Sequence, residues 1–454
     1  MPKINIDDTI AAIATPIGEG GIGIIRISGP GSITVSDKLF KAKSGKRLSE
    51  AKPASVILGH IVQDGETIDE VLVTLFKAPK SYTGEDIIEI SSHGGIVVTR
   101  KILDLIYHQA VRAAEPGEFT QRAFLNGRLD LTQAEAVLDV IQAKTDASLA
   151  VAQGQLQGSL SGKVKSIKDK LMQVFAHIEA FVDYPQEDLE VYSQTETRDK
   201  LEAVKQEINN LLASYQKGEI IREGILAVIV GRPNVGKSSL LNALLDRDRA
   251  IVSDVPGTTR DTLEEMIELE GVLFRVCDTA GLGDFDNKVD ALSVERTKKY
   301  LEQGQLFLWM LDGSEVLTEE DKKVYELVKD KNVIPVLNKS DLPQQCEWNE
   351  NSPVKISAKN REGLSDLESK MKEIVWKGQV TTEGIAVTRV RHKNALEQAL
   401  KDLEAAGQVF DNKESLEFLS FNIKAALDAL AELIGEVYTE DLLDIIFSEF
   451  CIGK

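Results

Sequence analysis

Four residues near the middle of the chain have the types and the spacing of a phosphate-binding loop. Gly231, Gly236, Lys237 and Ser238 complete the pattern G-x-x-x-x-G-K-[ST] within GRPNVGKSSLLNALL. Glycines are needed because successive backbone N–H groups must turn inward around a phosphate, and a following helix adds the positive end of its dipole. The lysine would reach the β- and γ-phosphates, and the serine hydroxyl would bind Mg²⁺.

The segments on either side have the order that such a loop requires. Residues 225–230, ILAVIV, form an apolar run that predicts a buried strand. Residues 238–245 after the loop predict a helix. The pattern therefore lies in the strand, loop and helix context of a P-loop.

Four further motifs follow in the order of a GTP-binding domain. PGTTRD at 256–261 contains Thr259, which can give Mg²⁺ a second hydroxyl when the γ-phosphate is present. DTAG at 278–281 provides a carboxylate for the Mg²⁺ water shell and a glycine N–H for the γ-phosphate. NKSD at 338–341 and SAK at 357–359 each follow a strand-like run, as DTAG does.

The nucleotide base can also be predicted. The Asp341 carboxylate can accept hydrogen bonds from the ring N–H and the exocyclic amine of guanine, and adenine lacks this pair of donors. Charge-assisted hydrogen bonds contribute about 1.5 to 3 kcal/mol each, so the motif favours GTP over ATP. The predicted nucleotide contacts are Asn234, Val235, Gly236, Lys237, Ser238, Ser239, Ser253, Asp254, Val255, Pro256, Gly257, Thr258, Thr259, Asp278, Thr279, Ala280, Gly281, Asn338, Lys339, Asp341, Ser357, Ala358 and Lys359.

Two parts of a Ras-like catalytic site are missing from the sequence. Leu282 follows DTAG where Ras-like enzymes have a glutamine that orients the attacking water, and no arginine is obviously placed as a finger. The acidic residues at 284, 286, 290 and 295 are candidates for orienting the attacking water instead. Asn234 has two interpretations of equal weight: a ligand of a monovalent cation, shared with carbonyls of 253–258, or a cap of the loop.

Composition restricts the class of protein. The chain has 454 residues, enough for about three domains, and its 43% hydrophobic and 28% charged residues are ordinary for a globular protein. No run reaches the length of a membrane helix and MPKINIDD is not a signal peptide, so we expect a cytoplasmic protein. Three cysteines lack metal-ligand spacing. The net charge of −20 opposes nucleic acid, so RNA would need a local basic patch or a basic partner.

The remaining segments predict a multi-domain architecture of α/β and α domains. Residues 1–118 have mixed strand and helix patterns, and GEGGIG at 18–23 is interpreted as a glycine turn because it runs into a strand, not into a Rossmann helix. Residues 119–217 and 381–454 carry long apolar helical stripes that need partners. We therefore expect one discontinuous helical domain, with a Ras-like P-loop GTPase domain at 218–380 inserted into it.

The whole chain resembles the bacterial and organellar MnmE (TrmE) family of tRNA-modifying GTPases. The resemblance rests on TIAAIATPIGEGGIGIIRISG, SYTGEDIIEISSHGG, PGEFTQRAFLNGRLDLTQAEAV, the P-loop with PGTTRD, and the terminal FCIGK. It implies an α+β N-terminal domain similar to folate-binding domains, a constitutive homodimer, and a complex with the FAD-dependent protein MnmG. The implied activity is addition of a carboxymethylaminomethyl or aminomethyl group at carbon 5 of the wobble uridine, position 34, of certain tRNAs.

The resemblance also implies cofactor sites. 5-Formyltetrahydrofolate or a related tetrahydrofolate would bind at Arg26, Glu89, Arg128 and Lys454. A carboxylate suits the aminopyrimidine edge of a pterin, and basic side chains suit the glutamate tail. Arg128 stands where some members carry lysine, which changes hydrogen-bond geometry. The potassium site would use Asn234, Ser253, Val255 and Thr258, and Mg²⁺ would use Ser238 and Thr259.

The implied catalytic residues are Lys237, Thr259 and the water-orienting Asp290, twelve residues after Asp278. The family often has glutamate at that position, so Glu295 stays an alternative. A regulatory GTPase in ribosome or RNA-complex assembly is the rival function, and a scaffold with a degenerate site is a third. The folate-type positions and FCIGK, in which Cys451 is either reactive or packed, favour the enzyme over the regulatory GTPase. The intact nucleotide motifs disfavour the scaffold.

Overall fold

The computed structural model describes residues 7–183, 194–246, 264–278, 298–348, 350, 352–375, 385–412 and 415–454. The chain divides into two compact units. The first comprises Met1–Ile141, Gln153–Asn210 and Arg391–Lys454, and the second comprises Gln142–Ala152 and Leu211–Val390. Among the described residues, no helix has the length and apolar character needed to cross a membrane.

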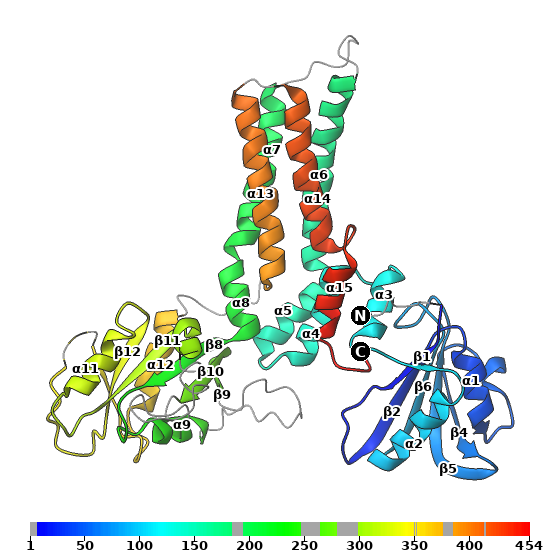
Figure 1. Ribbon diagram of the computed structural model, residues 1–454, viewed down its shortest axis with the longest axis horizontal. Coiled ribbons are helices and arrows are strands. Elements are labelled where there is room, and N and C mark those ends of the chain that lie inside the picture. Colours follow the sequence, from blue (N-terminus) through cyan, green and yellow to red (C-terminus); the bar gives the residue numbers. More distant parts are fainter. Residues whose placement is uncertain are drawn as a thin grey trace. The chain divides into compact units, whose positions relative to one another are not determined.

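A seven-stranded sheet begins the first unit, in the strand order β3-β4-β5-β6-β2-β1-β7 (Figure 1). Its neighbouring strands are antiparallel except for β1 and β7, and Arg26 on β2 is the register partner of Glu89 on β6. The predicted strand after the glycine turn is confirmed, since β2 already starts at Gly20. The elements are β1 (Ile10–Ile13), β2 (Gly20–Ser28), α1 (Ser32–Leu39), β3 (Phe40–Ala42), β4 (Ser55–Gln63), β5 (Glu66–Phe76), β6 (Ile87–Gly94), α2 (Ile96–Tyr107) and β7 (Arg112–Ala113).

Apolar side chains alternate along the strands, so they pack together on one face of this sheet. Val71, Val73 and Leu75 on β5 are buried with Ile102 and Ile106 of α2 in one core. The opposite face carries the intervening residues, which include Arg26 and Glu89. The polar residues of the N-terminal domain that the sequence singled out therefore lie on the face away from α2.

The rest of the first unit is helical, and its two chain segments form one assembly. Figure 1 shows α6, α7, α13 and α14 running side by side. Their apolar stripes are buried, as Leu160, Ile167 and Leu171 on α6 and Ile423 and Leu430 on α14 illustrate. The helices are α3 (Glu118–Leu125), α4 (Leu131–Gln142), α6 (Ser159–Asp183), α7 (Gln194–Ala213), α13 (Val390–Asp411), α14 (Leu416–Ile434) and α15 (Glu440–Ser448). The expectation of a discontinuous helical domain is confirmed.

The second unit has a six-stranded sheet in the order β13-β12-β11-β8-β10-β9, parallel except for the edge strand β9. Its central strand β8 is buried along its whole length, as the apolar run predicts. Ala147 and Val151 on α5 (Asp146–Leu156) pack in the core of this unit, although its main segment begins only at Leu211. The other elements are α8 (Tyr215–Glu223), β8 (Ile225–Val230), α9 (Lys237–Leu245), β9 (Glu264–Leu269), β10 (Val272–Asp278), β11 (Leu306–Asp312), α11 (Glu319–Glu326), β12 (Val333–Asn338), β13 (Val354–Lys355) and α12 (Leu364–Val375).

Candidate functional site

The phosphate-binding loop connects β8 to α9, as its sequence predicts. Lys237 is the first residue of α9, and its Nζ donates to the carbonyl oxygens of Gly231 and Arg232 at 2.8 and 3.0 Å. Asn234, inside the loop, has the left-handed φ of 64°. The lysine ammonium therefore lies against the loop that would surround a phosphate, at the N-terminus of a helix.

Ser238 and Asp278 meet at this loop. Ser238 Oγ donates to Asp278 Oδ2 at 2.6 Å, and Asp278 is the last residue of β10, which pairs in parallel with β8. A hydroxyl and a carboxylate are ligands that Mg²⁺ prefers. The donor set fits the predicted magnesium site, in which Ser238 would bind the ion directly and Asp278 would hold its water.

The predicted guanine-binding residues converge at the ends of neighbouring strands. Asn338 ends β12, its Nδ2 donates to the Val235 carbonyl oxygen at 2.7 Å, and its Oδ1 accepts from Ala358 N at 3.0 Å. The Asn338 side chain thus connects the phosphate-binding loop to the SAK motif. Ligands bind at this carboxyl edge in open parallel sheets.

The Asp341 side chain is held by the SAK motif. Ser357 Oγ donates to Asp341 Oδ1 at 2.6 Å. This hydrogen bond holds the pKa of Asp341 below its ordinary value. The carboxylate is therefore ionised at neutral pH, as the predicted guanine contact requires.

Two supporting residues were missed in the sequence. Asp312 ends β11 and accepts from Lys339 Nζ at 2.5 Å; burial alone would raise its pKa, but Lys339 and Ser314 lower it. Arg232 in the P-loop is held by Glu315 at 2.5 Å and Asp321 at 3.3 Å, so it is not a free arginine finger. The signal for Asp312 was its place after LFLWML, which matches the place of Asn338 after VIPVL.

A second group of predicted residues gathers in the first unit. Arg26 Nε and Nη2 both donate to Glu89 Oε1, at 2.8 and 2.7 Å, and Arg26 Nη1 donates to the Gly453 carbonyl oxygen at 3.3 Å. Burial and the nearby Arg26 charge lower the pKa of Lys454. The terminal residues, far away in sequence, therefore lie beside the β2–β6 pair that carries Arg26 and Glu89.

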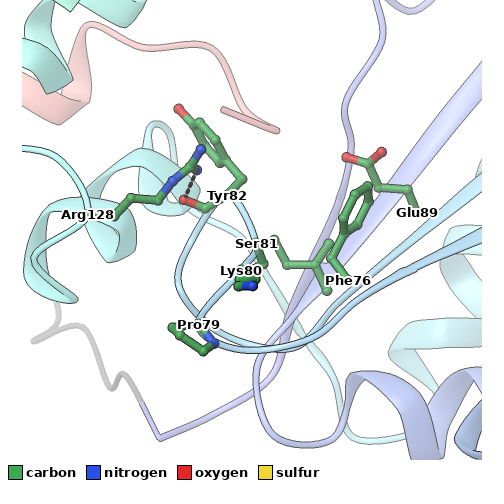
Figure 2. A pocket seen from close by; sticks show the side chains of 8 residues that line it. Phe76, Pro79, Lys80, Ser81, Tyr82, Glu89 and Arg128 are labelled. Carbon is green, nitrogen blue, oxygen red and sulfur yellow. Dashed lines mark hydrogen bonds between the residues drawn. The ribbon is translucent and has the colours of Figure 1, made fainter. Parts of the chain in front are cut away.

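Tyr82 connects this group to Arg128. Its ring lies 5.4 Å from the Arg26 guanidinium and 5.1 Å from that of Arg128, and its hydroxyl is 2.9 Å from Thr120 Oγ1. Arg128 Nη1 also donates to the Tyr82 carbonyl oxygen at 2.5 Å (Figure 2). Tyr82 was not singled out in the sequence, because an aromatic residue in a loop has no periodic signal.

A cavity of about 410 Å³ adjoins these residues. Its lining includes Phe76, Lys80, Tyr82, Glu89 and Arg128. Apolar walls with a few charged groups are typical of small-molecule sites. Of the four positions expected to bind a folate, Glu89 and Arg128 line this cavity, and Arg26 bonds to Glu89. Their role in binding a folate stays a prediction.

Several predicted site residues lie outside the described residues. These are the magnesium and potassium positions Ser253, Val255, Thr258 and Thr259, the neighbouring Asp254, Pro256 and Gly257, the DTAG residues Thr279, Ala280 and Gly281, and the water-orienting candidates Asp290 and Glu295. Their assignments remain predictions.

Comparisons with known proteins agree with this arrangement. Residues 131–451 match the family model described as the MnmE helical domain, and residues 9–128 match the GTP-binding protein TrmE N-terminus. Relatives named tRNA modification GTPase MnmE are 47% identical in Clostridioides difficile and 46% in Alkaliphilus metalliredigens, each match covering 99% of this chain and 100% of the relative. The G domain of the T. maritima FeoB iron transporter is 22% identical over 33% of this chain and 98% of that chain, with a TM-score of 0.25, which is too low to add to the comparison. The family models and the full-length relatives together show that the chain belongs to the MnmE (TrmE) family of tRNA modification GTPases.

Proposed function

We propose that this chain hydrolyses GTP to support modification of tRNA at carbon 5 of the wobble uridine, position 34. The product would be an aminomethyl or carboxymethylaminomethyl uridine, made together with the FAD-dependent protein MnmG. The observation that carries the GTPase role is the Asn338 side chain, which bonds to the P-loop at Val235 and to the SAK motif at Ala358. Family membership supports the tRNA role.

The described residues divide the work of nucleotide binding. Lys237 and the N-terminus of α9 bind the phosphates. Asp341 selects guanine, and Ser357 orients the Asp341 carboxylate. Lys339 does not need to touch the base, because its pairing with Asp312 anchors the loop that carries Asp341. Binding and orientation of GTP are thus set by strand ends of one sheet.

Two cations are part of the proposal. Mg²⁺ would be held by Ser238 and Thr259, and K⁺ by Asn234 with Ser253, Val255 and Thr258. When bound, these ions neutralise charge that develops on the phosphate oxygens. Asn234 supports the second site because it lies inside the phosphate-binding loop and carries an amide oxygen that can bind a cation. Asp290, or Glu295 in its place, would orient the attacking water.

The first unit would supply the one-carbon chemistry. Arg26, Glu89, Arg128 and Lys454 gather near one cavity, and a tetrahydrofolate derivative has the donor-rich ring and acidic tail to match them. We propose that the chain acts as a homodimer. The net charge of −20 supports a division in which the partner MnmG makes much of the contact with tRNA.

Nucleoside analysis of bulk tRNA tests this function. Cells that lack the protein should lose the modified wobble uridine, and the wild-type chain should restore it. Asp341→Asn and Glu89→Gln chains should each fail to restore it, the first through GTP and the second through the cavity. Intact modification in the deletion strain would overturn the proposal and favour the regulatory GTPase.

A further inference from the structure

Tyr82 lies in the loop between β5 and β6, and two arginine side chains share its ring. The guanidinium carbon of Arg26 lies 5.4 Å from the ring centroid, and that of Arg128 lies 5.1 Å from it. Figure 2 shows the Arg128 guanidinium beside Tyr82, with Glu89 on the other side of the cavity. The face of an aromatic ring attracts a cation at such distances. One side chain therefore contacts two of the positions expected to bind a folate.

The two arginines depend on Tyr82 to different degrees. Arg26 also contacts the Phe119 ring at 5.5 Å, and its Nε and Nη2 donate to Glu89 Oε1 at 2.8 and 2.7 Å. The Nη1 of Arg128 donates to the Tyr82 carbonyl oxygen at 2.5 Å. Within the described part of the chain, every hydrogen bond and ring contact of the Arg128 side chain is with Tyr82. The orientation of Arg128 is therefore set by this one residue.

Tyr82 is itself held at its hydroxyl and along its backbone. The hydroxyl lies 2.9 Å from Oγ1 of Thr120, a buried residue of α3, and burial raises the pKa of the phenol. The next residue, Thr83, accepts from Asn126 Nδ2 at its carbonyl oxygen at 2.7 Å, and its Oγ1 lies 2.7 Å from Ser28 Oγ. The ring and the carbonyl oxygen of Tyr82 are thus in place before a ligand binds.

We propose that Tyr82 is a positioning residue of the proposed folate site, on which this inference rests. Its ring and carbonyl oxygen hold the Arg128 guanidinium at the wall of the cavity, where it meets the carboxylates of the ligand. The same ring supports Arg26, which orients Glu89. An arginine without such support occupies many rotamers, and binding must then order it at a cost in affinity. Tyr82 removes this cost in advance.

Calorimetry with 5-formyltetrahydrofolate and the full-length chain tests the proposal. Tyr82→Leu removes the ring that both arginines contact and should weaken folate binding by about tenfold. Tyr82→Phe keeps the ring and the carbonyl oxygen, so its affinity should stay within about threefold of the wild type. GTP affinity should be the same in all three chains, because the nucleotide site belongs to the other compact unit.

A double-mutant cycle with Arg128→Gln distinguishes positioning from direct contact. If Tyr82 acts through Arg128, Tyr82→Leu should cost less than about threefold in the Arg128→Gln background, because only the support of Arg26 is then left to lose. Independent effects would multiply instead. A loss of about tenfold in both backgrounds would overturn the proposal and assign the Tyr82 ring to a direct contact with the ligand.

Tyr107→Leu is the matched control. Tyr107 ends α2 and packs against the core on the other face of the sheet, and its hydroxyl donates to the Ala11 carbonyl oxygen at 3.2 Å. The variant removes an aromatic ring and a hydrogen-bonded hydroxyl from the same domain, away from the cavity. Its folate affinity, measured below the unfolding temperature, should stay within about twofold of the wild type. An equal loss in this variant would overturn the proposal, because domain stability would then explain the effect of Tyr82→Leu.

Two further results would overturn the role of Tyr82 while the folate site stands. One is Tyr82→Leu binding the folate as tightly as the wild type. The other is Tyr82→Phe binding it as weakly as Tyr82→Leu, which would assign the effect to the hydroxyl and its contact with Thr120. A wild-type chain that does not bind 5-formyltetrahydrofolate overturns the proposed folate site together with this inference.

Discussion

Gly236 lies so close to Asn338 that a β-carbon on the glycine would stand 2.3 Å from the Asn338 amide nitrogen. The same nitrogen donates to the carbonyl oxygen of Val235 at 2.7 Å. Contact between the phosphate-binding loop and the guanine-binding loop therefore requires a glycine at this position. Its φ of 99° adds a second requirement, because side-chain residues rarely adopt that conformation.

Gly236→Ala should weaken GTP and GDP together by about tenfold or more, since a strained backbone costs about 1 to 3 kcal/mol and Asn338 must also move. Fluorescent nucleotide titration measures the effect. Gly271→Ala is the control, because this glycine also has positive φ, 85°, but its added β-carbon would meet nothing within 4 Å. Equal loss of affinity in both variants would contradict the contact argument.

Asp341→Asn should weaken GTP and GDP together by about tenfold to a hundredfold, because one charge-assisted acceptor is lost. The same change should improve binding of xanthosine triphosphate, whose ring has a carbonyl where guanine has an amine. Competition between the nucleotides measures both effects. Unchanged GTP affinity would show that Asp341 does not select the base.

Asn234→Gly should lower the potassium-stimulated rate of GTP hydrolysis towards the rate in sodium. Glycine keeps the left-handed backbone at φ 64° and removes only the carboxamide, so GTP affinity should change much less. Carbonyl sites distinguish ions by coordination and dehydration cost, which is why sodium is the comparison. A variant that potassium still stimulates would assign Asn234 to capping the loop.

Gly453→Ala should displace the C-terminal tail, because its φ is 95° and an added β-carbon would lie 2.3 Å from the Ile13 carbonyl oxygen. We expect loss of folate binding and of tRNA modification with GTP affinity intact, as for deletion of residues 451–454. Gly45→Ala, at φ 73° with open space around it, is the control. Parallel loss of GTP binding would contradict this division of labour.

Glu135→Gln should destabilise the helical assembly by about 3 to 5 kcal/mol near neutral pH. Glu135 is buried and pairs with Arg391 at 2.8 Å and His392 at 2.6 Å; burial opposes its charge, but these two partners hold its pKa well below 4.5. A carboxylate whose pKa is lowered in the folded state stabilises the fold at any pH above its ordinary pKa. This contribution to the free energy of unfolding is lost as the pH falls toward the folded-state pKa. The difference between wild type and variant should therefore shrink below pH 4.5.

Thermal unfolding across pH measures that difference. Glu397→Gln, which removes an exposed partner of Lys393 on the same helix, should change stability by less than about 0.5 kcal/mol. A gap that stays constant down to acid pH would show that Glu135 does not contribute through its charge.

Elements with local signals could be predicted from the sequence. The spacing of apolar residues predicts β8 and the apolar stripes of the helices. The spacing of the P-loop motif predicts a strand, a loop and a helix in that order. Both patterns depend only on residues a few positions apart. The NKSD and SAK motifs identified the base for the same reason. The interpretation of GEGGIG as a turn also followed from its local context, the β-like segment after it.

Contacts between residues far apart in the sequence could not be predicted in this way and became visible in the folded chain. Asp312 supports Lys339 because parallel strands β11 and β12 end side by side, and Tyr82 lies between Arg26 and Arg128 because α3 and its following loop pack on residues 82–85. The terminal Gly453 reaches Arg26, more than four hundred residues away in sequence, through one hydrogen bond that no local pattern predicts. Such contacts depend on how elements pack, and packing is a property of the whole chain, not of any sequence window.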